Sequence, residues 1–128
     1  MLTTLELLKQ RCEKENLSLW ELSVKDEIEN TKVSEEDIFN RLQRTLDVMK
    51  ESSHQALKVP VVSVTGMTGG NAKKMNDYFL SGDTVLGDTA ARAMAMALST
   101  SEVNAAMGRI VAAPTAGSAG ILPATLMT

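Results

Sequence analysis

Two glycine-rich segments in the second half of this 128-residue chain could hold an anionic ligand. The first, Thr-Gly-Met-Thr-Gly-Gly from Thr65 to Gly70, runs directly into a segment with a helical pattern. Free backbone amides and the positive end of a helix dipole suit a carboxylate or phosphate, and Lys73 or Lys74 could add a full charge. The segment matches neither a P-loop nor a dinucleotide-binding fingerprint. Taken alone, such a segment is more often a plain tight turn followed by surface lysines.

The second segment, Ala113 to Gly120, places threonine and serine hydroxyls beside two glycines. It could form another cradle of exposed backbone amides, because glycine adopts conformations that a Cβ forbids. The alternative is a close helix crossing, in which small residues only allow two backbones to approach. Asn104 could orient a ligand through its side-chain amide, or it could be a local helix cap. The residue pattern alone leaves both choices open.

Few other residues could do chemistry. His54 is the only histidine and has no acid placed to complete a catalytic triad, so we interpret it as a solvated side chain. Cys12 is the only cysteine, and we interpret it as a small buried hydrophobic residue. One cysteine and one histidine cannot complete a zinc or iron–sulfur ligand set. The sequence therefore predicts no metal site in this chain and leaves the catalytic residues unknown.

The composition excludes several classes of function. The net charge is −3 and the basic residues are scattered, so we expect no nucleic acid partner. The uncharged segment from Ile110 to Thr128 contains two prolines and several hydroxyl residues, which favours burial in protein over a membrane span. The N-terminus reaches charged residues quickly and does not resemble a signal peptide. With one cysteine and no leader, a cytoplasmic location is the expectation.

The elements that must position the glycine segments are predicted to be helices. Ser18 with Glu21 forms a capping box, and Ser34 with Asp37 starts a longer helix that Pro60 ends. A further helix is predicted from Asn71 to Leu80, after an extended connector. For the remaining helices, Asp83 or Thr84 is the expected cap of an alanine-rich helix, and Ser101 the expected cap of a short turn. The apolar stripes are Trp20, Val24 and Ile28 in one helix and Ile38, Leu42, Leu46 and Met49 in the next.

Taken in order, three motifs resemble the alpha chain of the bacterial iron–sulfur-dependent L-serine dehydratases. They are S-V-T-G-M-T-G-G from Ser63, E-V-N-A-A-M-G from Glu102 and A-P-T-A-G-S-A-G from Ala113. The resemblance runs from about residue 18 to the end. It implies an all-α fold that is a truncated part of a larger helical catalytic domain. Residues 1–58 would be an N-terminal helical region, and residues 59–128 the incomplete start of the catalytic domain with its substrate loops.

The resemblance also implies an activity. Enzymes of this family convert L-serine to pyruvate and ammonia, and a 4Fe–4S cluster assists the loss of water by acting as a Lewis acid on the serine hydroxyl. The cluster cysteines are expected beyond Thr128, so this chain alone is expected to be inactive and to work with a β subunit in an oligomer. The general base is not identified. By position, the residues expected to bind L-serine are Thr68, Gly69, Gly70, Lys74, Asn104, Thr115, Gly117, Ser118 and Gly120.

Two other functions stay open at the level of sequence. The chain could belong to a related hydro-lyase that acts on another small hydroxy acid, because the cradles indicate a carboxylate and little else. It could instead be a non-catalytic helical interaction module, in which the glycine-rich loops only pack helices.

Overall fold

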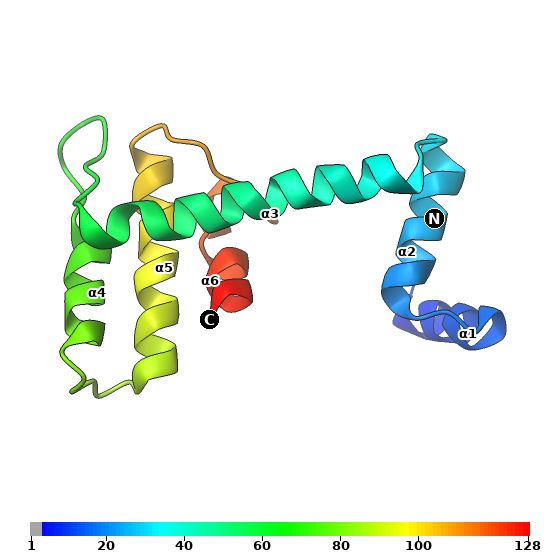
Figure 1. Cartoon of the computed structure of the whole chain (residues 1–128), viewed down its shortest axis with the longest axis horizontal. Coiled ribbons are helices and arrows are strands. Elements are labelled where there is room, and N and C mark those ends of the chain that lie inside the picture. Colours follow the sequence, from blue (N-terminus) through cyan, green and yellow to red (C-terminus); the bar gives the residue numbers. More distant parts are fainter. Residues whose placement is uncertain (1–3) are drawn as a thin grey trace. The chain divides into compact units, whose positions relative to one another are not determined.

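The computed structural model describes residues 4–128, which fold almost entirely into helices (Figure 1). The single β pairing among these residues is an antiparallel bridge between Val62 and Gly69. The prediction of an all-α fold is therefore confirmed. The helices are α1 (Leu5–Glu15), α2 (Leu19–Thr31), α3 (Glu35–Lys58), α4 (Asn71–Leu80), α5 (Asp88–Ala105) and α6 (Ile121–Met127), with a 3₁₀ turn, η1 (Ala116–Ser118), before α6.

The chain divides into two compact units. The N-terminal unit extends to Gln43 and the C-terminal unit begins at Arg44, so the division falls inside α3. The helix itself ends at Lys58, two residues before Pro60, as the sequence predicts. The predicted domains, 1–58 and 59–128, place a boundary at the end of α3, and this boundary stays a prediction.

Ion pairs join α1 to α2 in the N-terminal unit. The Arg11 guanidinium donates to both carboxylate oxygens of Asp26, at 2.8 and 2.6 Å, and Lys25 pairs with Glu15. The hydrogen bond from Arg11 lowers the pKa of Asp26 below its usual value. At the start of α2 the capping box of Ser18 and Glu21 is present, as predicted. Local polar contacts thus define this unit more than a large core does.

The apolar stripes of α2 and α3 are only partly buried. Trp20 and Phe39 meet edge to face, with ring centroids 6.4 Å apart, yet they are 59% and 43% exposed. Of the second stripe, Leu42 and Leu46 are also exposed, and only Ile38 and Met49 are buried. A helical pattern shows which side chains share a face, and it does not show what covers that face.

The C-terminal unit is built around α5, which packs against α4 and α6 (Figure 1). Small side chains form much of its core, among them Ala72, Ala91, Ala95 and Ala124. The chain before α6 approaches α5 closely at Gly120, where a Cβ would lie 2.5 Å from the carbonyl oxygen of Ala97 in α5. The backbones can lie this close only because Gly120 has no side chain.

A buried serine connects α5 to α3. The Ser99 hydroxyl accepts a hydrogen bond from the Ala56 amide at 3.0 Å and donates one to the Ser52 carbonyl at 2.7 Å. Those two backbone groups are four residues apart, which is the spacing that an α-helix normally joins directly. The Ser99 hydroxyl therefore links a carbonyl and an amide of α3 that stand at the i, i+4 spacing. It is fully buried.

The limits of α4 are as predicted, whereas those of α5 differ from the prediction in two places. The helix begins at Asp88 rather than next to Asp83 or Thr84, because the Val85 amide donates to the Tyr78 hydroxyl at 2.6 Å and keeps this segment outside the helix. At the other end α5 continues through Ser101. The hydroxyl of Ser101 donates to the Ala97 carbonyl one turn earlier, a bond that suits a helix interior rather than a cap.

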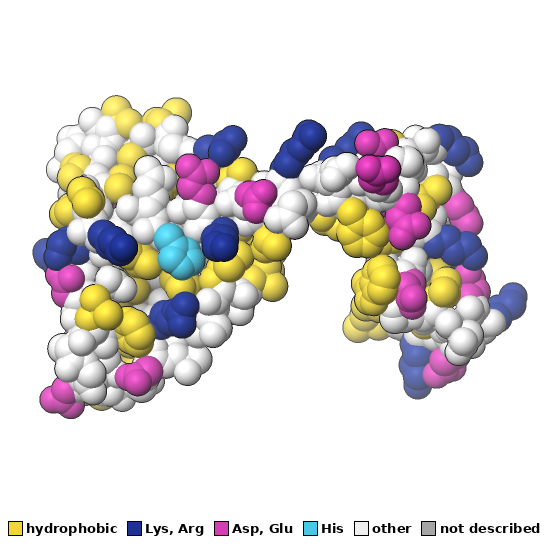
Figure 2. Space-filling model, in the orientation of Figure 1, with side chains coloured by type: hydrophobic (Ala, Val, Ile, Leu, Met, Phe, Trp, Pro, Cys, Tyr) yellow, Lys and Arg dark blue, Asp and Glu magenta, His cyan; other side chains and the backbone are white. Residues whose placement is uncertain are grey.

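Charged side chains of both signs lie on the surface. Acidic and basic side chains are interspersed over the visible face of each unit, and no basic stripe stands out (Figure 2). None of the helices within residues 4–128 is long and apolar enough to cross a membrane.

Candidate functional site

The last turn of α5 connects the two glycine-rich loops. The carbonyl of Ala105 accepts a hydrogen bond from the Val64 amide in the first loop, at 3.2 Å. The side-chain amide of Asn104 donates to the Ala116 carbonyl in the second loop, also at 3.2 Å. Figure 1 shows the first loop and the C-terminal end of α5 at the same end of the α4–α5 pair. The two motifs that sequence analysis singled out are thus attached to neighbouring residues of one helix.

The first loop is a small hairpin. The Ser63 amide donates to the Thr68 carbonyl at 2.8 Å, and the Ser63 hydroxyl accepts from the Thr68 amide at 3.2 Å. Gly69 has a φ of +148°, and a Cβ there would lie 2.3 Å from the Val61 carbonyl oxygen. The tip of the hairpin is open to solvent, with Met67 85% exposed. The hairpin therefore presents the Thr68 side chain at its exposed surface and uses Gly69 for a close backbone approach.

The start of α4, which sequence analysis assigns to an anion, is occupied by the chain's own carboxylate. Glu102 Oε1 accepts hydrogen bonds from the Asn71 amide at 2.5 Å and from the Ala72 amide at 3.2 Å. A substrate carboxylate cannot use these two amides while Glu102 holds them. An acidic group thus lies at the positive end of the α4 dipole, and this group belongs to the protein.

Glu102 was not among the candidate residues, although the sequence carries a signal for it. It is the only acidic residue after Asp88, and it lies in a stretch of small and apolar residues. In the structure it is 6% exposed, and its second carboxylate oxygen, Oε2, is buried without a hydrogen-bond partner among the described residues. An acid buried in an otherwise uncharged helix segment needs a partner, and this requirement could have drawn attention to it.

The second loop is held by its own hydroxyl groups. Thr115 Oγ1 and Ser118 Oγ lie 3.0 Å apart, and Ser118 Oγ also accepts from the Thr115 amide at 3.3 Å. Thr115 precedes the η1 turn, which contains Gly117 and ends at Ser118. Asn104, for which ligand binding and helix capping were both open, in fact supports this loop through the Ala116 carbonyl. The loop is preformed, and Thr115 and Gly117 remain exposed.

The two lysines after the first loop differ in their surroundings. Lys73 pairs with Asp77 one turn along α4. Lys74 is exposed and forms no ion pair with the residues that the structure describes. Of the two, Lys74 therefore has the ammonium that is available to a ligand, in agreement with its assignment by motif position. Its contact with a substrate stays a prediction.

The roles of the two glycines in the second loop can be tested separately by mutation. We expect Gly120→Ala to destabilise the C-terminal unit by about 1–3 kcal/mol, because its Cβ would overlap the Ala97 carbonyl. Gly117→Ala is the matched control, since a Cβ there meets only the Thr115 hydroxyl at 3.9 Å. Urea unfolding of both variants measures the difference. Equal midpoints would contradict the close-packing role of Gly120.

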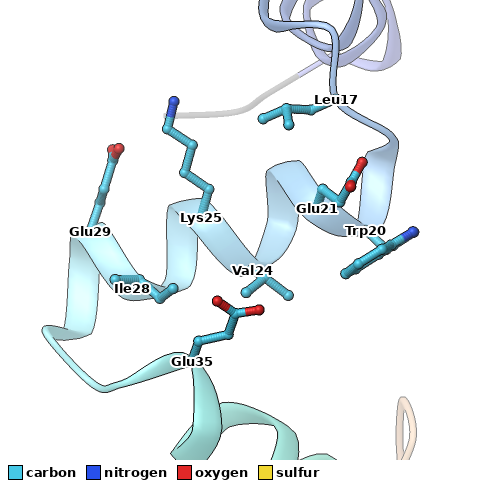
Figure 3. Close-up of a pocket in the computed structure, with 8 residues that line it drawn as sticks. All are labelled: Leu17, Trp20, Glu21, Val24, Lys25, Ile28, Glu29 and Glu35. Atoms are coloured by element: carbon cyan, nitrogen blue, oxygen red, sulfur yellow. The ribbon is translucent and has the colours of Figure 1, made fainter.

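The N-terminal unit has a groove of its own, of about 390 Å³, along α2 (Figure 3). Trp20, Val24 and Ile28 give it an apolar wall, and the carboxylate of Glu35 points toward that wall (Figure 3). Its polar groups are largely used within the protein, since Glu21 accepts from Ser18 and Lys25 pairs with Glu15. None of its lining residues belongs to either glycine-rich loop, and the groove offers no free cation for a carboxylate ligand.

No metal site is formed by the part of the chain that the structure describes. It contains no group of three or more His, Cys, Asp or Glu side chains that could hold a metal ion. Cys12 is half-buried in α1. His54 is exposed, with Nδ1 2.9 Å from both the Ser53 hydroxyl and the Lys50 carbonyl, as expected of a solvated histidine.

The matches to known proteins all indicate the same family. A model of the serine dehydratase alpha chain family matches residues 14–128. The chain is 44% identical to the L-serine dehydratase alpha chain of Peptoniphilus asaccharolyticus over 127 residues, which are 99% of this chain and 44% of that protein. It is 42% identical to the probable L-serine dehydratase alpha chain of Bacillus subtilis (strain 168) over 121 residues, 94% of this chain and 40% of that protein. This chain thus spans less than half the length of these relatives. No solved structure shows a significant match.

Proposed function

Because the chain belongs to the serine dehydratase alpha chain family, we propose that it forms the substrate-binding start of an alpha subunit that converts L-serine to pyruvate and ammonia. The observation that carries the proposal is the attachment of both glycine-rich loops to the last turn of α5, through Ala105 and Asn104. Two family motifs that are far apart in sequence are thereby held together. Such an arrangement suits a site that must hold a small molecule from two sides.

In this proposal each loop contributes polar groups of different kinds. Thr68, Thr115 and Ser118 supply hydroxyl groups, and Lys74 supplies the positive charge for the substrate carboxylate. Gly117 leaves the backbone of η1 open to a ligand. Gly69, Gly70 and Gly120 act through the backbone positions that they permit. A preformed loop loses little conformational freedom on binding, which favours orientation of the substrate.

The 4Fe–4S cluster expected from the family does not fit the residues of this chain. A cluster of this kind is held by several cysteine thiolates, whereas the sequence has Cys12 alone, in the N-terminal unit. We therefore propose that the cluster ligands lie outside these 128 residues. The role of this chain is then to bind and orient L-serine, and the chain alone is inactive.

Exposed apolar side chains support a role within a larger assembly. In α6, Ile121, Leu122 and Leu126 are 64%, 40% and 56% exposed. Apolar side chains that are exposed together on a protein surface often mark a site of interaction with another protein. The relatives are named alpha chains, and we propose that this chain works with a β subunit in an oligomer in the cytoplasm.

Pyruvate formation tests this proposal. The complete gene product with its β partner, reconstituted anaerobically with iron and sulfide, is expected to release pyruvate from L-serine and to lose this activity on brief exposure to air. A cluster-loaded protein that leaves L-serine unchanged and acts on another small hydroxy acid would favour the related hydro-lyase. A loaded protein inactive on all such acids would favour a non-catalytic interaction module.

Lys74→Ala in the complete enzyme is expected to lower kcat/KM for L-serine at least about 30-fold, because a carboxylate held in the site loses its charge partner. Lys73→Ala is the matched control, since Lys73 already pairs with Asp77 on the surface of α4. Steady-state kinetics of both variants measure the effect. Near wild-type turnover of the Lys74 variant would remove this lysine from the site.

A further inference from the structure

The two oxygens of the Glu102 carboxylate have different surroundings. Oε1 accepts from the first two amides of α4, those of Asn71 and Ala72. Oε2 has no hydrogen-bond partner among the described residues, and it is buried. Capping of α4 therefore uses one oxygen of the carboxylate and leaves the other available.

Oε1 lies at the point where the first amides of α4 and the positive end of its dipole meet. Two backbone amides and the positive end of the α4 dipole all stabilise negative charge at this point. A carboxylate oxygen that is buried without a hydrogen-bond partner is rare in native proteins, because the lost hydration is not replaced. Oε2 therefore requires a donor, and a positively charged one suits it best.

None of the described cations nearby fills this role. In α4, Lys73 pairs with Asp77, and Lys74 is exposed. Arg109, which follows α5, pairs with Glu51. The donor therefore comes from outside the described residues: from a ligand, from a water molecule or from another part of the protein.

The location of Glu102 favours a ligand as the donor to Oε2. It lies on the same turn of α5 as Asn104 and Ala105, which hold the second and the first loop. We propose that Glu102 Oε2 accepts a hydrogen bond from the α-ammonium group of the amino acid substrate. This inference rests on the proposed function and deepens it. Glu102 then distinguishes α-amino acids from hydroxy acids that lack the amino group.

Because Oε2 is buried, a ligand reaches it only when neighbouring segments shift, and the exposed hairpin of residues 63–70 is attached to the same turn of α5. The backbone hydrogen bond from Val64 to Ala105 holds this hairpin to α5. The hairpin tip is exposed, so no large core has to open when it moves.

The substitution Glu102→Gln in the complete enzyme tests the roles of the two carboxylate oxygens separately. The glutamine carbonyl can still accept from Asn71 and Ala72, whereas its NH₂ group, now at the position of Oε2, would face the ammonium as a second donor. The probes are L-serine and 3-hydroxypropanoate, which is serine without its amino group. Calorimetric Kd values for both ligands, together with KM for L-serine, are the readouts.

We expect the Kd and KM for L-serine to rise at least about 30-fold in the glutamine variant, as when one partner of a buried charge pair is removed. The Kd for 3-hydroxypropanoate is expected to stay within about 3-fold of the wild-type value, and the melting temperature near that of wild type, because capping of α4 is retained. Glu102→Ala is the comparison for the capping role. It removes both oxygens, so the melting temperature should fall as well.

An unchanged ratio of the two Kd values in Glu102→Gln would overturn the inference. A lower melting temperature with an unchanged ratio would also overturn it, since Oε2 would then pair with a cation of the protein. Wild-type enzyme that binds L-serine but forms no pyruvate would contradict the proposed function alone, and the ratio of Kd values would still decide the role of Glu102. Wild-type enzyme that binds neither ligand would contradict both.

Discussion

Replacing Gly69 with alanine is expected to destabilise the C-terminal unit by more than about 3 kcal/mol and to abolish activity of the complete enzyme. The new Cβ would lie 2.3 Å from the Val61 carbonyl oxygen and 2.7 Å from the Val62 Cα, and both of these are backbone atoms. Neither can move without breaking the bridge between Val62 and Gly69. The hairpin that presents Thr68 would then lose its position.

Gly66→Ala is the control for this prediction. Gly66 also has a positive φ, +73°, and a Cβ there would meet nothing within 4 Å. Its cost should be limited to backbone strain of about 1–2 kcal/mol. Urea unfolding gives the two stabilities, and hydrogen exchange of the Ser63 amide, which donates to Thr68, reports whether the hairpin is intact. Equal destabilisation by both substitutions would show that strain alone accounts for the effect.

The second large effect is expected at the buried hydroxyl between α3 and α5. Ser99→Ala removes the acceptor of the Ala56 amide and the donor to the Ser52 carbonyl. The two backbone groups would either stay unpaired in the interior or close on each other by moving α3. We expect a loss of about 2–4 kcal/mol in the free energy of unfolding, since a buried group without its partner costs about 1–3 kcal/mol.

Ser101→Ala is the matched control, because the Ser101 hydroxyl is exposed and bonds only within α5. Its stability should stay within about 0.5 kcal/mol of wild type. Calorimetric unfolding and hydrogen exchange of the Ala56 amide measure both variants. A Ser99 variant with wild-type stability and a protected Ala56 amide would mean that α3 closes its own hydrogen bond at no cost.

The helices could be predicted where a local signal defines their ends. Ser18 and Glu21 cap α2 through contacts three residues apart, and the limits of α4 follow from Gly70 and the apolar spacing after it. The start of α5 could not be found in this way. Its position depends on the hydrogen bond between Val85 and the Tyr78 hydroxyl, and residues 81–87 offer several plausible caps but no local reason to prefer one.

The candidate site could be predicted in part. The motifs located both loops, and the family assignment made from them is confirmed. The partner of the α4 amides could not be found, because Glu102 lies 31 residues from Asn71 and only the packing of α4 against α5 brings them together. A helix-end pattern predicts that an anion is needed there and does not reveal which one. The roles of the nine predicted substrate-binding residues stay predictions.

The attachments of the two loops to α5 have a mechanical consequence. Glu102, Asn104 and Ala105 fall within about one helical turn, so they occupy roughly 5 Å along the helix axis. A rotation or a small slide of this turn would displace the hairpin, the start of α4 and the η1 turn together. The two loops are therefore not independent in their motion: a strain applied at one is transmitted to the other through a single rigid segment.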